Sequence, residues 1–147
     1  MSGHSLINCW IHIVWSTKER FPYFANPEMA NECSKILLEI SRKNNFRIKT
    51  FYVNPEHVHI LLKLNQYYCL EEIVKKLKGV SSHIINKSLF SSKFRWERGY
   101  SAVSVSPNVV DKVINYIKNQ KEHHRVKTFA EEWEIFLKEY EKEYGTH

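Results

Sequence analysis

The order of hydrophobic patterns along the chain predicts an α+β fold built on one antiparallel sheet. Segments typical of strands, rich in alternating, β-branched or aromatic residues, occur four times, and segments with three- and four-residue apolar spacing separate and follow them. The order strand, helix, strand, strand, helix, strand and two final helices matches a ferredoxin-like βαββαβ sandwich. With 147 residues, of which 43% are hydrophobic, we expect a single domain over residues 1–147.

The first half of the chain supplies three strands and one helix. Residues 5–17 are rich in β-branched and aromatic side chains and predict a strand. An apolar stripe predicts a helix over residues 27–44. Residues 46–54 alternate, and residues 57–64 follow a turn at Pro55, so we expect these two segments to pair as a hairpin.

The second half repeats the helix, adds a strand and ends in two helices. Residues 69–90 carry a second apolar stripe, and residues 99–106 alternate as a fourth strand. Residues 107–124 predict a helix with a proline in its first turn, the tyrosine-bearing helix discussed below. Residues 128–144 predict a C-terminal amphipathic acidic helix, so the core of the domain spans about residues 6–125.

The net charge favours a polyanionic partner. It is +6 with neutral histidines, and the pI is about 9.2. Residues 128–147 hold six Glu and two Lys, a net of −4, so residues 1–127 carry +10. The basic charge favours such a partner over an acidic-substrate enzyme or an ordinary neutral binder.

The cysteines and the apolar runs indicate in which cellular compartment the protein is expected. The three cysteines are widely spaced with no Cys-x-x-Cys, which argues against a disulfide framework or a thiolate zinc site. We expect reduced thiols that fill the core. No apolar run is long enough to span a bilayer and no signal pattern opens the chain, so we expect a cytoplasmic protein with no membrane contact.

Two histidines stand one residue apart at the start of the predicted strand 57–64. On a strand, His57 and His59 project to one face, while Val58 and Ile60 project to the other. Two imidazoles on a rigid strand can form half of a metal site. The alternative is a pair on the sheet surface without a ligand. His12, in the first strand, is expected to be a sheet residue with satisfied hydrogen bonds and not a ligand.

The helix predicted over residues 107–124 offers complementary groups. Its apolar sector ends at Ile117, yet the same sector continues through Gln120, with Tyr116 at its edge and four residues before Gln120. The alternative is a boundary tyrosine beside an amide at a helix end. These groups suit metal-assisted attack on a phosphodiester: two imidazoles, a carboxamide oxygen and a phenol. A phenol has a pKa of about 10 and is a poor nucleophile at neutral pH, so a cation that polarises the phosphate assists its attack.

Several motifs in order resemble one known family. The segments "EHVHILLKL", "LKGVSSHIIN" and "VINYIKNQKEHH", with "HIVWSTKERF" and "WERGYSAVSVS", are similar to the single-tyrosine HUH transposases of short bacterial insertion sequences, including the REP-associated tyrosine transposases. The similarity runs from about Leu6 to Arg125.

The resemblance implies a role for each site residue. His57, His59 and Gln120 would bind Mg²⁺ or Mn²⁺, and Mn²⁺ should bind at least as well because imidazole suits it better. Tyr116 would be the nucleophile that joins the 5′ phosphate of a cleaved single strand, and Glu56 would hold a ligand in place. Family members typically act as homodimers on hairpin-bearing single-stranded DNA, without a small-molecule cofactor. Whether Tyr116 acts within its own chain or on the partner's site is left open.

A basic surface is the candidate for DNA contact. It comprises Lys75, Lys76, Lys78, Arg95, Trp96 and Arg98. Interleaved cations and aromatic rings suit phosphates and unpaired bases, although such a run is also common on a solvated face.

Four functions remain open from the sequence. The first is an active transposase, and the second is a domesticated relative that processes chromosomal hairpin repeats by the same chemistry. The third is a non-catalytic hairpin-binding protein that keeps the fold, against which the intact site residues argue. The fourth is a metal-dependent hydrolase that uses the histidines without Tyr116.

Overall fold

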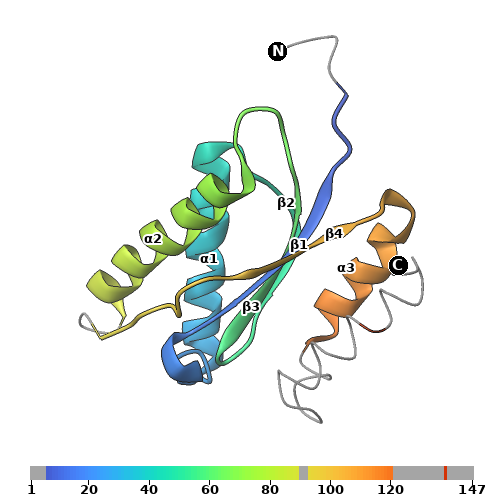
Figure 1. The fold of residues 1–147 in the computed structure, drawn as a ribbon. Coiled ribbons are helices and arrows are strands. Elements are labelled where there is room, and N and C mark those ends of the chain that lie inside the picture. Colours follow the sequence, from blue (N-terminus) through green and yellow to red (C-terminus); the bar gives the residue numbers. More distant parts are fainter. Residues whose placement is uncertain (1–5, 90–92, 121–137, 139–147) are drawn as a thin grey trace.

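Four strands form one sheet, and helices cover both of its faces (Figure 1). The structure is a computed structural model that describes residues 6–89, 93–120 and 138. The strands are β1 Trp10–Ser16, β2 Arg47–Val53, β3 His57–Lys63 and β4 Ser101–Val105. They lie in the order β2-β3-β1-β4, and every neighbouring pair is antiparallel. This topology confirms the predicted ferredoxin-like α+β fold.

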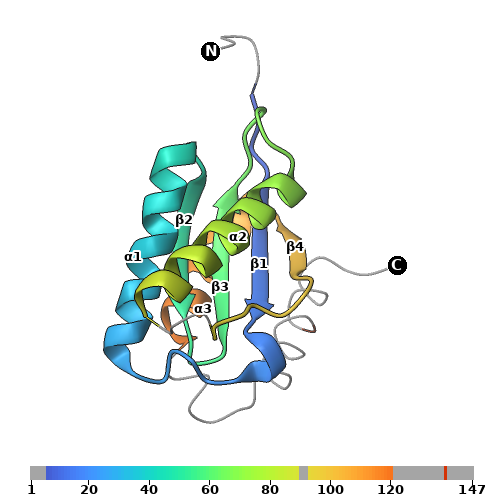
Figure 2. The same ribbon diagram turned by 90° about the vertical axis from the view of Figure 1, so that its left-hand side faces the viewer.

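Two long helices pack on one face of the sheet, and a shorter helix lies on the other (Figures 1 and 2). The long helices are α1, Pro27–Asn44, and α2, Leu70–Ser88. The shorter helix is α3, Val110–Lys118, and a 3₁₀ turn over Pro107–Val109 precedes it. A further 3₁₀ turn, Lys18–Arg20, follows β1. The central strands are therefore enclosed from both sides.

Helix α1 has the bounds that the sequence predicts, because residues at both ends satisfy free backbone groups. The Asn26 side chain accepts a hydrogen bond of 2.8 Å from the Glu28 N–H, and Pro27 occupies the first turn. Asn45 ends the helix in the left-handed conformation, with a φ of 56°. The predicted helix 107–124 is described as far as Gln120, and the predicted helix 128–144 lies outside the described residues apart from Lys138.

The alternation of β3 divides the interior into two clusters. Its even-numbered residues point to α1 and α2, where Val58, Ile60 and Leu62 join the main core. Leu61, on the opposite face, joins a smaller cluster under α3. The other buried members of that cluster are Val105, Val110, Val113 and Ile117. Since both faces of β3 are covered, polar side chains on the α3 face are buried too.

The cysteines depart from expectation. Cys33 is buried in the main core, as predicted, but Cys9 and Cys69 are exposed. Cys69 lies just before the first turn of α2, where its backbone N–H bonds to Glu72, so a terminal position and not apolar burial explains its place. None of the described helices is long and apolar enough to cross a membrane.

Candidate active site

The two histidines of β3 lie on the face that α3 covers. His57 and His59 are both fully buried, and their ring centroids are 5.0 Å apart. Both side chains therefore project to one face of the sheet, as their spacing predicts. The space between them and α3 is the candidate site.

Helix α3 brings the other two expected residues to the histidines of the same chain. The Tyr116 ring centroid is 5.7 Å from that of His59. Gln120, two residues beyond the end of α3, is fully buried. These residues thus come together although α3 begins 47 positions after the end of β3.

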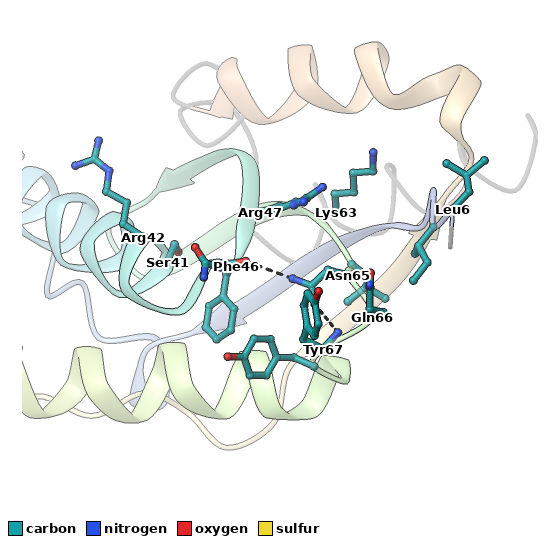
Figure 3. A pocket seen from close by; sticks show the side chains of 13 residues that line it. Leu6, Ser41, Arg42, Phe46, Arg47, Lys63, Asn65, Gln66 and Tyr67 are labelled. Carbon is teal, nitrogen blue, oxygen red and sulfur yellow. Dashed lines mark hydrogen bonds between the residues drawn. The ribbon is translucent and has the colours of Figure 1, made fainter. Parts of the chain in front are cut away.

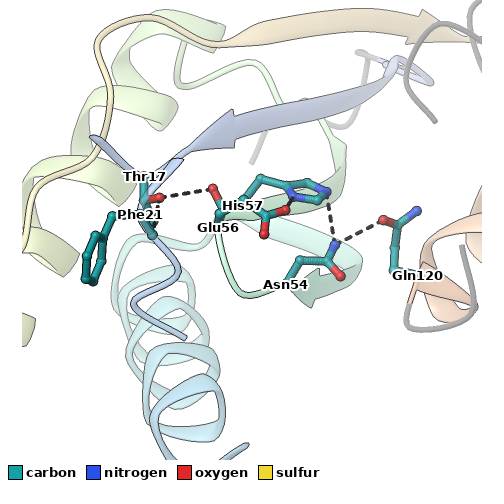
Figure 4. A network of polar contacts seen from close by, with 6 residues as sticks. All are labelled: Thr17, Phe21, Asn54, Glu56, His57 and Gln120. Atoms are coloured by element: carbon teal, nitrogen blue, oxygen red, sulfur yellow. Dashed lines mark hydrogen bonds and ion pairs between the residues drawn. The ribbon is translucent and has the colours of Figure 1, made fainter. Parts of the chain in front are cut away.

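His57 is held between a carboxylate and an amide (Figure 4). Its Nε2 lies 3.1 Å from Nδ2 of Asn54, and its Nδ1 lies 2.7 Å from Oε1 of Glu56. An amide nitrogen can only donate, so Nε2 accepts and Nδ1 carries the hydrogen that is donated to Glu56. This tautomer directs the Nε2 lone pair into the site, as a metal-binding imidazole requires.

Asn54 was not expected at the site. Its Nδ2 donates both to His57 and to Oε1 of Gln120, at 3.0 Å, and the residue is almost fully buried. Its place just before Pro55 indicates a turn residue and nothing more. The turn explains why Asn54 reaches the site: its backbone N–H bonds to the His57 carbonyl at 2.8 Å, which brings the two side chains close together.

His12 is the second residue whose part in the site was not foreseen. It lies on β1, and its Nε2 is 2.9 Å from Nδ1 of His59. It is a fully buried sheet residue. Burial, with a smaller contribution from His59, holds the pKa of His12 well below its usual range, so the ring is neutral. Its ring also lies 6.1 Å from that of Tyr116.

The donor set suits a hard or borderline divalent cation. Among the described residues no three His, Cys, Asp or Glu side chains are grouped to hold a metal, and a described group that could add to His57 and His59 is the amide oxygen of Gln120. Two imidazoles and the Gln120 oxygen form a mixed nitrogen and oxygen set, which fits Mn²⁺ or Mg²⁺ and not a thiolate zinc centre. The residues present therefore fit the cation that the resemblance implies.

The predicted DNA surface is only partly available. Lys75, Lys76, Arg95 and Arg98 are exposed. The ammonium of Lys78 instead donates to the carbonyls of Glu97 and Gly99, each at 2.7 Å. Desolvation lowers the pKa of Lys78, although nearby Glu97 opposes this effect.

Trp96 does not lie on that surface. It is 9% exposed, its Nε1 donates to Ser81 at 2.9 Å, and its ring packs against Phe94 at a centroid distance of 4.7 Å. It cannot stack on a base without leaving the core. The expectation that Trp96 contacts DNA is therefore wrong. Its large aromatic ring is buried in the main core instead.

A second basic region lies at the opposite end of β3 from His57 (Figure 3). It is a pocket of about 940 Å³ whose lining includes Arg42, Arg47, Lys63 and Tyr67, and none of its described lining residues is acidic. Arg47 and Lys63 are direct partners across β2 and β3. Like charges at such a position repel each other, so an anion between them would be stabilising.

The sequence and the fold were compared with known proteins. Residues 5–120 match the family model described as "Transposase IS200 like". The chain belongs to the IS200-like transposase family. The chain is also 30% identical, over 130 residues and 84% of each chain, to the transposase for insertion sequence element IS200 of Salmonella typhimurium. It is 28% identical, over 74% of this chain and 81% of the relative, to the ISDra2 transposase TnpA of Deinococcus radiodurans.

Solved structures agree with this membership in the IS200-like family. A crystal structure assigned as a transposase from Deinococcus radiodurans R1 matches with a TM-score of 0.67 and 25% identity, over 82% of this chain and 96% of that one. A REP-associated tyrosine transposase bound to a REP hairpin shares the fold, with a TM-score of 0.61 and 16% identity, over 84% of this chain and 74% of that one. An IS200-like transposase is an enzyme of DNA transposition, and the site described above is its candidate catalytic centre.

Proposed function

We propose that this IS200-like transposase nicks and rejoins single-stranded DNA beside hairpins, with Tyr116 as the nucleophile. One observation carries the proposal: the Tyr116 ring lies beside His59, the His59 ring lies beside His57, and Asn54 links His57 to Gln120, with both histidines and Gln120 fully buried in the same chain. A surface tyrosine of ordinary structural function would not need three buried polar neighbours. Buried polar groups are retained where they are paired or used.

The reaction exchanges one phosphoester bond for another. The Tyr116 oxygen attacks the phosphorus, the bond from phosphorus to the 3′ oxygen breaks, and the phenol proton is lost as the 3′ oxygen gains one. The 5′ phosphate stays on Tyr116 and the other end carries a free hydroxyl. Because no bond energy is lost to water, the hydroxyl of a second strand can reverse the step and join the DNA.

His57, His59 and Gln120 would hold the divalent cation, Mg²⁺ or Mn²⁺. When bound, the cation supplies polarisation of the phosphate oxygens. Glu56 fixes the His57 ring through the bond to Nδ1, which makes it a positioning residue. Burial of the site excludes bulk water, which favours attack by the phenol over hydrolysis.

The charge distribution supports DNA as the substrate. Exposed cations on and after α2 include Lys75, Lys76, Arg95 and Arg98, and the pocket at the far end of β3 adds Arg42, Arg47 and Lys63. Hairpin recognition is supported by the REP hairpin named for the structural neighbour. We further propose that the protein acts as a homodimer in the cytoplasm.

The test is covalent capture. Wild-type protein is incubated with labelled single-stranded hairpins and Mn²⁺ or Mg²⁺, and denaturing gels are examined for label attached to protein. We expect a metal-dependent adduct that Tyr116→Phe abolishes. Tyr52→Phe is the matched control, since Tyr52 pairs with His59 across the sheet and also packs near α3. Loss of the adduct with Tyr52→Phe alone would move the nucleophile to Tyr52.

Two further outcomes separate the alternatives. Cutting by Tyr116→Phe, with free 5′ phosphates and no adduct, would indicate a hydrolase. Tight hairpin binding without an adduct under any divalent metal would indicate a non-catalytic binding protein. His57→Ala should abolish cleavage and leave hairpin binding largely intact, and loss of both would show that His57 is structural.

A further inference from the structure

We propose that Asn54 is a fourth ligand of the divalent cation, and that its side-chain NH₂ occupies the cation's place until the cation binds. The inference rests on the proposed function, because it requires that His57 and Gln120 bind a cation. It concerns a residue to which neither the motifs of the sequence nor the expected ligand set gives a role.

The geometry places the amide between two ligand atoms. Nδ2 of Asn54 lies 3.1 Å from Nε2 of His57 and 3.0 Å from Oε1 of Gln120 (Figure 4). These are the two atoms whose lone pairs would face a shared cation. A group with two N–H donors satisfies both lone pairs at once, so it holds the ligands at a spacing that a cation can take over.

This arrangement cannot persist when the cation binds. An N–H donor repels a cation, and both lone pairs are occupied by hydrogen bonds. Rotation of the amide by about 180° about its last torsion exchanges Nδ2 for Oδ1 without moving the backbone. The amide oxygen is then directed at the cation, as Asn oxygens are in Mg²⁺ and Ca²⁺ sites.

Rotation in place is favoured over departure of the side chain. Asn54 is only 1% exposed, so movement of its side chain out of the site would disturb the packing around it. Its backbone N–H is bonded to the His57 carbonyl at 2.8 Å, which fixes the turn that carries it. The residue must therefore remain beside the cation, and only its oxygen can lie there favourably.

The composition of the site gives a second argument. Within residues 6–89 and 93–120 no group of three His, Cys, Asp or Glu side chains is placed to hold a metal ion, because His12 and Glu56 contact ring nitrogens of the histidine pair and do not face the site. Two imidazoles and one amide oxygen supply three ligands, whereas Mn²⁺ and Mg²⁺ prefer about six. An Asn54 oxygen raises the protein ligands to four and leaves about two positions for phosphate and water.

The experiment compares Asn54→Asp with Asn31→Asp, which adds the same charge on the exposed surface of α1. Mn²⁺ binding is measured by calorimetry without DNA, and melting temperatures are measured with and without Mn²⁺. We expect Asn54→Asp to bind Mn²⁺ at least tenfold tighter, because a carboxylate only accepts. We also expect it to lower the Tm of the metal-free protein, since both amide donors are lost. Asn31→Asp should do neither.

A second measurement uses the wild-type chain, so it is independent of the folding of any variant. In ¹⁵N-labelled protein, the side-chain NH₂ signals of Asn54 and Gln120 are followed during a Mg²⁺ titration. Large shifts of both signals are expected as the amide turns.

The outcomes separate the two proposals. If the wild type binds Mn²⁺ while Asn54→Asp behaves as Asn31→Asp does and the NH₂ signal of Asn54 stays unshifted, Asn54 is not a ligand and the proposed function stands. If the wild type binds no divalent cation and forms no adduct, both proposals are wrong.

Discussion

At the residue scale, the site is organised by the direction of hydrogen bonds. Glu56 accepts from His57, Asn54 donates to His57, and the same amide donates to Gln120. Each group has one role because its partner can only donate or only accept. A substitution that reverses the direction of one of these hydrogen bonds should therefore also weaken the hydrogen bond that the partner makes to its next neighbour.

Glu56→Gln removes the charge from the bond to His57 while keeping an oxygen acceptor. The neutral acceptor holds the ring less firmly and makes Nε2 a weaker ligand, so we expect Mn²⁺ affinity to fall about 10-fold. Calorimetry of Mn²⁺ binding checks this. Glu39→Gln, at an exposed position of α1, is the control and should leave the affinity unchanged. Equal affinities for wild type and Glu56→Gln would contradict the role given to Glu56.

The three thiols should differ in reactivity. Cys9 and Cys69 are exposed, while Cys33 is fully buried, and burial raises the pKa of the Cys33 thiol far above its ordinary value. Because the thiolate is the reactive form, a colorimetric thiol reagent should label Cys9 and Cys69 in the native protein and reach Cys33 only in denaturant. Rapid labelling of all three without denaturant would show that α1 opens readily.

At the element scale, α3 is attached by its own small cluster and not by the main core. Val110, Val113 and Ile117 pack with Leu61 and Val105 on the outer face of the sheet. Tyr116 and Gln120 lie on or just after this helix, so its seating fixes the distance from the nucleophile to the histidines. Elements with small interfaces open at lower free energy than the global core.

Ile117→Val and Ile85→Val make the same change at fully buried positions of α3 and α2. Each should cost about 0.5–1.5 kcal/mol of unfolding free energy, measured with urea. Only Ile117→Val is expected to slow adduct formation, by several-fold, since it loosens the helix that carries Tyr116. A similar loss of rate in both variants would mean that overall stability, and not the seating of α3, limits the reaction.

At the scale of the whole molecule, the proposed cation site and a basic pocket lie at opposite ends of the central strand β3. The histidine site begins β3 and the pocket with Arg47 and Lys63 ends it. Seven residues at about 3.3 Å each make β3 about 20 Å long from first to last residue. One bound DNA hairpin can therefore contact the pocket while its single-stranded flank reaches Tyr116.

The double variant Arg47→Gln, Lys63→Gln tests this arrangement. Loss of two phosphate contacts should weaken hairpin binding and reduce the slope of log K against log salt by about 1.5–2. Fluorescence anisotropy over a range of salt concentrations gives both quantities. Lys35→Gln, Lys43→Gln removes equal charge from α1, where each lysine already faces a glutamate, and should change the slope little. Identical slopes for the two double variants would exclude the pocket from the DNA path.

The sequence by itself determined the order of the elements, the bounds of α1 and the common face of His57 and His59. These features depend on residue periodicity and on capping residues, which act over one or two turns of chain. The resemblance located Tyr116 and Gln120 because their spacing on a helix is also local.

The tertiary structure alone decided which side chains touch across the fold. Asn54 bonds to Gln120, 66 positions away, and His12 bonds to His59, 47 positions away. It also placed Trp96 in the core and left Cys69 exposed. Such contacts follow from how the strands register and how α3 packs over them, and no local pattern contains that information. Only the packing of distant segments therefore places Asn54 between His57 and Gln120, two of the proposed cation ligands.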